Sequence, residues 1–179
     1  MRLNKILLFS LVFCFVFPIL SYAGQLEDAV TAIGNEEYEK AYELLCPLAD
    51  EGNAEAQNSL GLLYVNGLGV EQDPTKGLSL IMKAANQGHE EARSNAYTLC
   101  YAEAQDGNLG AMHNVAYMCL HGWGGEVDPN NCIALLEVAA TNGFTRSASA
   151  LSQIYTKGMF GIAPDEDKAS YWRSLAAEE

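Results

Sequence analysis

A pattern of small, apolar, glycine and helix-capping residues recurs along this chain, and it constrains the fold more than any other feature. Its first complete copy, residues 53–88, reads as two helices joined by a turn. Gly67 and Gly69 end the first helix, because glycine accepts the positive φ that a helix exit often needs. Asp73 and Pro74 begin the second, since aspartate caps free N–H groups and proline loses no hydrogen bond there. The repeating unit is therefore predicted to be a helical hairpin.

Further copies follow in register along the rest of the chain. Complete copies occupy residues 108–143 and 144–179, and the first of these repeats both helix-starting signals. Residues 89–107 hold a shortened copy with room for about one helix instead of two. Residues 24–52 match the pattern more weakly and are predicted to form an N-terminal capping hairpin. Hairpins that repeat in this way stack into a solenoid, in which each copy contacts only its neighbours.

The motif resembles a known family. It reads A-x-x-x-L-G-x-x-Y-x-x-G-x-G-V-x-x-D-x-x-K from Ala56 to Lys76 and continues with A-A-x-x-G, and it is similar to the Sel-one-like repeat (SLR), a relative of the tetratricopeptide repeat. The resemblance covers nearly all of residues 25–179. It implies an all-α fold, a right-handed α/α solenoid of stacked antiparallel helical hairpins, and a role in protein–protein interaction. The chain departs from the pattern in the shortened copy and at two positions, namely Cys119 in place of Tyr64 and Phe160 in place of Gly69.

The N-terminus has the composition of a signal peptide. Two basic residues precede an apolar run over residues 6–20, and small residues lead up to Ala23. The run is shorter than the roughly 20 residues that cross a bilayer. We therefore expect residues 1–23 to be removed after Ala23, which leaves a periplasmic or secreted protein with no stable membrane anchor. A retained anchor and a lipoprotein modified at Cys14 are the alternatives, although bulky Phe13 argues against the second.

The chain is strongly acidic, with a formal net charge of −13. Loss of the N-terminal segment removes two basic residues and increases this excess. Such a surface repels phosphate backbones and anionic lipid, so the charge argues against nucleic-acid binding and favours a basic or neutral protein partner. The alternative is that the acidic residues, which are scattered over all copies, only maintain solubility.

Four cysteines lie beyond the predicted cleavage site. Cys119 falls near the end of one predicted helix and Cys132 near the start of its antiparallel mate, so a disulfide between them is possible in an oxidising compartment. Cys46 and Cys100 lie in different copies and are expected to be buried thiols. A metal site formed by Cys119, His121 and Cys132 is the alternative, but no C-x-x-C or close histidine pair supports it. We expect no bound metal.

Motifs of catalysis or cofactor binding are missing from the sequence. The patterns S-x-x-K, G-x-S-x-G, H-E-x-x-H and the P-loop do not occur. The three histidines, His89, His113 and His121, are expected to face solvent. We therefore predict a protein that is not an enzyme and has no cofactor. The different-class alternative is an enzyme-like protein that binds cell-wall or β-lactam compounds, as resemblance to cysteine-rich SLR proteins implies. Labelling with a tagged penicillin would distinguish the two.

A solenoid binds through equivalent positions of successive helices. The outward positions of the first helices, together with the glycine-rich turn, give a candidate protein-binding surface made of Asn58, Leu62, Ser94, Thr98, His113, Tyr117, Trp123, Ser149 and Gln153. Leu62 and Tyr117 are candidate anchors, because large apolar and aromatic residues often carry interface energy. The alternatives are that neighbouring copies cover these two residues and that Trp123 packs on its own hairpin. Trp172 matches core leucines and is expected to be buried.

The leading hypothesis is an adaptor or inhibitor that binds an unknown protein in the bacterial envelope or outside the cell. A structural spacer without a partner is a further alternative. The last copy ends without a following helix to cover Tyr171 and Leu175. We predict a monomer, with self-association through this edge as the alternative.

Overall fold

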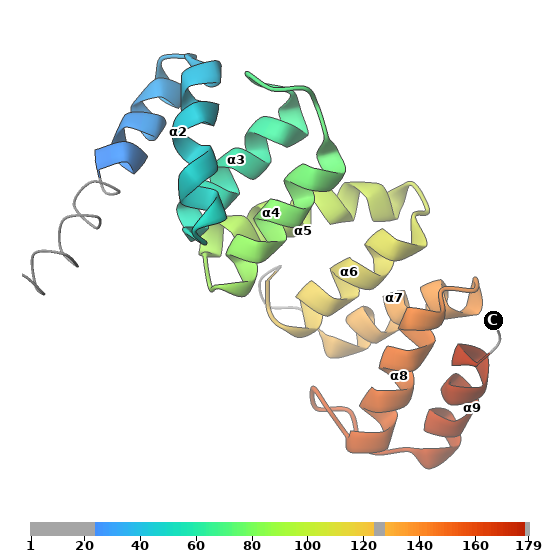
Figure 1. Ribbon diagram of the computed structural model, residues 1–179. Helices are drawn as coiled ribbons and strands as arrows, with labels where there is room; N and C mark the ends of the chain where they lie inside the picture. The colour runs from blue at the N-terminus through green and yellow to red at the C-terminus, as the bar shows by residue number, and fades with distance from the viewer. Residues whose placement is uncertain (1–23, 124–127, 178–179) are drawn as a thin grey trace, which may run out of the picture. The chain divides into compact units, whose positions relative to one another are not determined.

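The computed structural model describes residues 24–123 and 128–177, and over these residues the chain consists of helices and the turns between them (Figure 1). Residues 24–34 are helical. They are followed by α2 (Tyr38–Asp50), α3 (Ala54–Asn66), α4 (Pro74–Asn86), α5 (Glu90–Gln105), α6 (Leu109–Leu120), α7 (Pro129–Thr141), α8 (Thr145–Lys157) and α9 (Glu166–Ala176). The all-α prediction is confirmed. The predicted signal peptide lies outside the described residues, and within them no helix combines the length and apolar character needed to cross a membrane.

Polar residues placed just before the helices fix where several of them begin. Asn53 accepts a hydrogen bond from the backbone N–H of Ala56 at 2.9 Å, and this satisfies a donor that has no partner inside α3. The same kind of side-chain cap starts four other helices, through Asp73 at α4, Asn108 at α6, Asp128 at α7 and Asp165 at α9. The regular spacing of these caps is the local reason for the regular spacing of the hairpins.

The chain forms two compact units, one ending at His89 and the other beginning at Glu90. In the first unit α3 packs against both α2 and α4. The helices α3 and α4 approach closely where Gly61 faces Gly77. A Cβ atom added at Gly61 would lie 2.6 Å from Ile81 Cγ1 and 2.8 Å from the carbonyl oxygen of Gly77. Glycine at both positions lets the two backbones approach this closely, because a side chain at either position would clash with the facing helix.

A tyrosine and a lysine connect the two helices α3 and α4 of the first complete hairpin. Lys76 Nζ donates to Tyr64 Oη at 2.7 Å and lies 4.2 Å from the centre of the same ring. This hydrogen bond raises the pKa of Lys76. The last hairpin repeats the arrangement, with Lys168 Nζ 4.9 Å from the ring centre of Tyr155. The tyrosine and lysine of the motif are thus structural partners.

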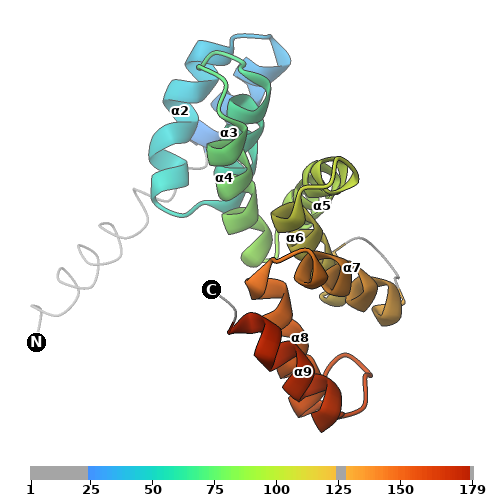
Figure 2. The same cartoon turned by 90° about the vertical axis from the view of Figure 1, so that its right-hand side faces the viewer.

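The second unit contains the hairpins α6/α7 and α8/α9, which pack on each other through α7 and α8 (Figure 2). Its core includes Leu136 and Leu151 from facing helices. Trp172 of α9 is buried in the same core, as expected from the sequence. Tyr171 beside it is half exposed.

A single helix, α5, occupies the shortened copy, and its two ends have different characters. It begins after the glycine turn that follows α4, where the first helix of a hairpin is expected. It ends at Gln105, one residue after buried Ala104, and Gly107 follows in the turn, as α4 ends at Asn86, one residue after buried Ala85, and is followed by Gly88. The helix therefore starts like a first helix and ends like a second one. Its buried residues form one narrow line of small side chains, Ala92, Ala96, Cys100 and Ala104.

Candidate functional site

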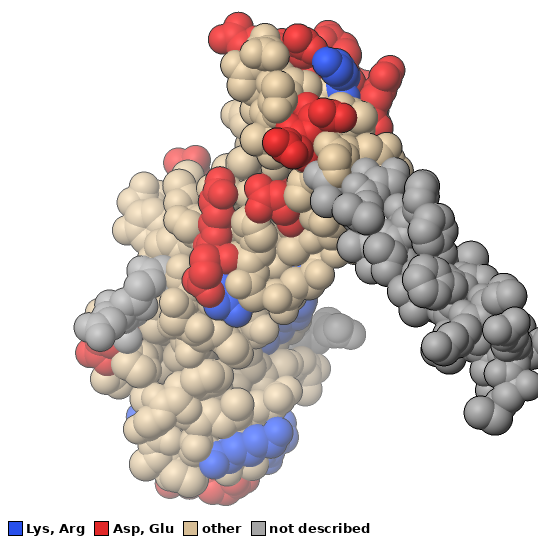
Figure 3. All heavy atoms as spheres, turned by 90° about the vertical axis from the view of Figure 1, so that its left-hand side faces the viewer, with Lys and Arg blue, Asp and Glu red and all other residues tan. Residues whose placement is uncertain are grey.

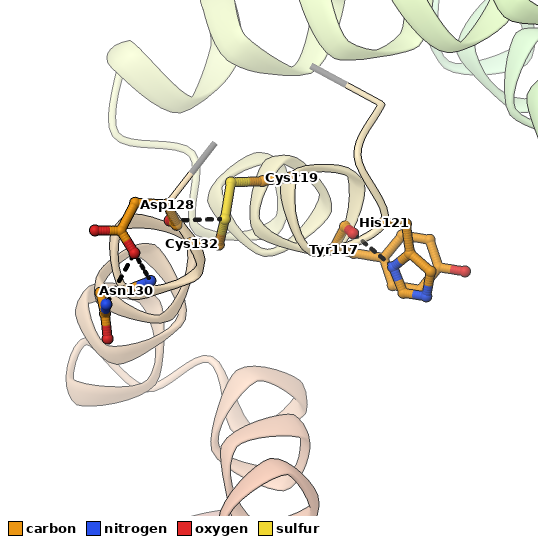
Figure 4. Close-up of a disulfide and its surroundings, with 6 residues drawn as sticks. All are labelled: Tyr117, Cys119, His121, Asp128, Asn130 and Cys132. Carbon is orange, nitrogen blue, oxygen red and sulfur yellow. Dashed lines mark hydrogen bonds between the residues drawn. A yellow bond between two sulfur atoms is a disulfide. The ribbon is translucent and has the colours of Figure 1, made fainter. Parts of the chain in front are cut away.

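A disulfide fixes the third hairpin at its turn. Cys119, near the end of α6, is bonded to Cys132, near the start of α7, with 5.8 Å between their Cα atoms (Figure 4). Cys119 stands where the first copy has Tyr64, so a covalent bond replaces the tyrosine–lysine contact of the other hairpins. Because the two sulfur atoms are bonded to each other, they are not available as metal ligands. Within the described residues no group of three or more histidine, cysteine or carboxylate side chains could hold a metal ion.

Four aromatic rings follow one another from the end of α6 to the turn after α8. We call this set, Trp123, Tyr117, His121 and Phe160, the aromatic row. Successive ring centres are 6.0 Å, 4.1 Å and 5.4 Å apart. His121 Nδ1 donates to the carbonyl oxygen of Tyr117 at 2.8 Å, which holds the imidazole against the phenol ring (Figure 4). Tyr117 is 41% exposed, so much of this aromatic surface faces solvent.

An apolar cavity of about 280 Å³ adjoins the aromatic row in the second unit, and we call it the groove. Most of its wall is made of the side chains of Leu120, Leu136, Ala150, Ile154, Met159 and Phe160. Polar groups enter it from His113, Tyr117, His121 and Gln153. Phe160 has φ 56°, a left-handed backbone conformation that is uncommon for a residue with a side chain. The same position in the first copy is Gly69, so the ring of Phe160 is an addition of the last copy.

His113 lies on α6, packs against the start of α8 and is partly buried. Its Nδ1 is hydrogen-bonded to Ser147 Oγ at 2.9 Å, and its ring centre is 5.4 Å from that of Phe144. Burial lowers the pKa of His113, and the positive charge of Arg146 lowers it further. The imidazole is therefore held in its neutral form at the edge of the groove.

A second depression of about 470 Å³ continues from the groove toward the first turn of α8, and we call it the side pocket. It shares His113, Ala150 and Gln153 with the groove and adds Thr145, Arg146, Ser149 and Ala176. The two depressions thus form one surface along α6 and α8. Within the described part of the chain, none of the residues that line either depression is an aspartate or a glutamate.

The structure brings together five of the nine residues predicted to bind a partner. His113, Tyr117 and Gln153 line the groove, Ser149 lines the side pocket, and Trp123 contacts Tyr117. Ser94 and Thr98 are exposed on α5 away from these depressions, and Thr98 Oγ1 donates to the carbonyl of Ser94 at 2.9 Å. Leu62 is half buried in the first unit.

Two exposure predictions are wrong. Asn58 was expected to face outward but is 2% exposed, because α3 has α2 and α4 packed against it and buries more than one face. Of the three histidines, His121 is exposed, but His89 and His113 are partly buried. His89 Nε2 lies 2.9 Å from a carboxylate oxygen of Glu55, and His113 is covered by the first turn of α8. In each case a contact with another segment of the chain covers a side chain that was expected to be exposed.

Sequence reasoning missed the residues that build the wall of the groove. Met159 and Phe160 lie in the turn after α8, where helical periodicity gives no direction. The one signal in the sequence for this wall was that Phe160 replaces the glycine found at the same position in the first copy. His121 was visible as a histidine at a helix end, but one of its two neighbours in the aromatic row, Phe160, comes from another segment.

Acidic side chains are concentrated on the N-terminal helices. Eight carboxylates in residues 24–52 are exposed, namely Glu27, Asp28, Glu36, Glu37, Glu39, Glu43, Asp50 and Glu51. Figure 3 shows red side chains gathered on the surface at this end of the chain. Lys40 is the single basic residue of this stretch, and its Nζ lies 2.8 Å from Glu37. The acidity of the chain is therefore uneven over its length.

Comparison with known proteins identifies the repeats. Residues 54–89, 109–144 and 145–179 match the family model of the Sel1 repeat. Two similar solved structures are a Sel1 repeat protein from Oxalobacter formigenes, with 26% identity, 78% of this chain covered and a TM-score of 0.44, and c5321, a protective antigen of uropathogenic Escherichia coli with an SLR fold, with 25% identity, 79% covered and a TM-score of 0.44. This chain spans 62% and 34% of the lengths of these two proteins. The immunity protein Pa5087 from Pseudomonas aeruginosa is 17% identical, with 87% of this chain and 81% of that one covered and a TM-score of 0.32.

Proposed function

Because the chain belongs to the Sel1 repeat family, we propose that it is an exported, non-catalytic binding protein that acts as an adaptor or inhibitor of another protein. Its place of action is the bacterial envelope or the outside of the cell. The Cys119–Cys132 disulfide supports this location, since such bonds persist in oxidising compartments.

The observation that carries the proposal is the aromatic row beside the groove. Tyrosine and tryptophan are enriched among the residues that dominate binding energy at protein interfaces. They offer a large apolar area together with a polar group, and here they adjoin a cavity with an apolar wall. The serine hydrogen-bonded to His113, Ser147, is completely buried and so cannot reach a substrate, and His121 donates to a carbonyl. The arrangement is better suited to holding a side chain than to transforming one.

The test is affinity capture from envelope extracts with the wild-type protein and two tyrosine variants. Tyr117→Asp places a charge in the aromatic row, and we expect it to weaken binding at least 30-fold, the effect of losing an anchor worth about 2 kcal/mol. Tyr101→Asp is the matched control, because Tyr101 is similarly exposed, at 45%, but lies on α5 and stacks on Tyr97.

A partner retained by the wild type and by the Tyr101 variant, but lost from the Tyr117 variant, supports the proposal. Equal capture by all three proteins would show that the groove is not the binding surface. Thermal unfolding of each variant checks that the fold is intact.

A further inference from the structure

The charge around the groove differs from that of the chain as a whole. Arg146, exposed in the first turn of α8, lines the side pocket and forms no ion pair with any described residue. Its positive charge acts on the neighbouring His113 of the same pocket, whose pKa it lowers. A chain with a net charge of −13 thus presents, at one end of this apolar surface, a cation that pairs with no carboxylate among the described residues.

We propose that the groove binds an internal segment of a partner protein in which an apolar anchor side chain fills the cavity and an aspartate or glutamate side chain nearby pairs with Arg146. This inference rests on the proposed function and specifies the chemistry of the partner. It differs from the expectation, based on net charge alone, that the partner is basic or neutral.

The size of the groove indicates a single anchor. A cavity of about 150 Å³ accepts a benzene molecule, and pockets for drug-sized ligands begin near 300 Å³. At about 280 Å³ the groove holds one large aliphatic or aromatic side chain. Its apolar wall favours leucine, isoleucine, methionine, phenylalanine or tryptophan at the anchor position.

The distance along α8 sets the expected spacing between the apolar anchor and the acidic residue of the partner segment. Arg146 lies in the first turn of α8, and Gln153, beside the groove, follows seven residues later, which corresponds to a rise of about 10 Å. An extended peptide covers about 10 Å in three residues. We therefore expect the acidic residue about three positions from the anchor.

The surface also extends beyond the anchor on its other side, toward Trp123. The guanidinium of Arg93 lies 5.6 Å from the ring centre of this tryptophan, and it is already paired with Glu90 at 2.7 Å. A segment that crosses the groove thus meets aromatic surface on one side and Arg146 on the other. This favours an internal segment over a chain end.

Distance explains how an acidic residue binds to an acidic protein. At physiological ionic strength exposed charges are screened over about 8 Å, so the pairing is governed by the nearest groups. No described residue that lines the side pocket is an aspartate or a glutamate.

The experiment is a selection of displayed random 12-residue peptides on the protein expressed from the full sequence. The wild type should enrich an apolar or aromatic residue followed or preceded at about three positions by aspartate or glutamate. Arg146→Glu should enrich lysine or arginine at that position instead. Lys157→Glu is the matched control, because Lys157 is exposed in the last turn of the same helix and lines neither depression.

Affinities of one selected peptide then give the size of the effect. Arg146→Gln should weaken binding about two- to fivefold at low salt, the range of an exposed ion pair, and the difference should vanish in 1 M salt. Anchors enriched without an acidic preference, or a preference unchanged by Arg146→Glu, would overturn this inference and leave the proposed function intact. Peptides whose binding is insensitive to Tyr117→Asp would overturn the proposed function itself.

Discussion

Reduction of the disulfide is the perturbation that this structure defines most sharply. Cys119 and Cys132 are 13 residues apart, and closing a loop of this length removes enough entropy from the unfolded chain to stabilise the fold by about 3 kcal/mol. The third hairpin has no tyrosine–lysine contact at this place that could take over, since Cys119 occupies the tyrosine position. We expect the variant Cys119→Ser/Cys132→Ser to lose about the same free energy of unfolding as the reduced wild type.

Urea and thermal unfolding, followed by far-ultraviolet circular dichroism with and without a phosphine reductant, measure this loss. If the second unit unfolds by itself, about 3 kcal/mol lowers its Tm by roughly 12–24 °C, and if the whole chain unfolds together the shift is roughly 6–12 °C. The size of the shift therefore also reports the cooperative unit. The double serine variant is the control, because the reductant should no longer affect it.

Equal stability of the oxidised and reduced wild type would refute this reasoning. A thiol titration under denaturing, non-reducing conditions provides the independent check. In the protein without residues 1–23, which contain Cys14, it should detect Cys46 and Cys100 but neither Cys119 nor Cys132.

Two further predictions concern packing and pH. Gly61→Val should destabilise the first hairpin by about 2 kcal/mol in urea unfolding, because its Cβ meets Ile81 and the α4 backbone, whereas Gly34→Ala, with open space around the added Cβ, should be neutral or stabilising. His113, whose pKa is lowered in the fold, should make the wild type lose stability relative to His113→Gln as pH falls below about 6.5, because the unfolded chain gains the proton first. Parallel stability curves between pH 7.5 and 5 would contradict this.

The hairpins were predictable because their signals are local. An asparagine or aspartate before a helix caps that helix whatever surrounds it, and Asn53, Asp73 and Asp128 do so where the pattern placed them. The apolar spacing of each helix likewise reports its own inward face. The family resemblance rests on these same residues, and the Sel1 repeat matches confirm it.

The path through residues 89–107 shows where local signals become ambiguous. The sequence after Gly88 has the pattern of a first helix, and the sequence before Gly107 has that of a second. Each half is consistent with a helix, so nothing in between marks a break and α5 continues through both. The sequence therefore showed that this copy is shortened. It did not show that its single helix would combine the start of a first helix with the end of a second one.

Exposure was less predictable than helix position, because it depends on more than one neighbour. Periodicity within α3 identifies one inward face, but α2 and α4 both pack on this helix and Asn58 is buried as a result. The turn residues Met159 and Phe160 have no periodicity at all. Residues of this kind can be located only when the packing of successive hairpins is known.

The groove is formed where the second unit departs from its own repeat. Tyr117 stands at the position of Leu62 in the first copy, His121 at that of Asn66, and Phe160 at that of Gly69. Each replacement adds an aromatic ring, and the three rings contact one another in a row along the wall of the groove. The positions that keep the pattern are the caps and buried small residues that hold the helices in place. Positions that follow the repeat thus hold the helices in place, and positions that depart from it line the surface for which binding is proposed.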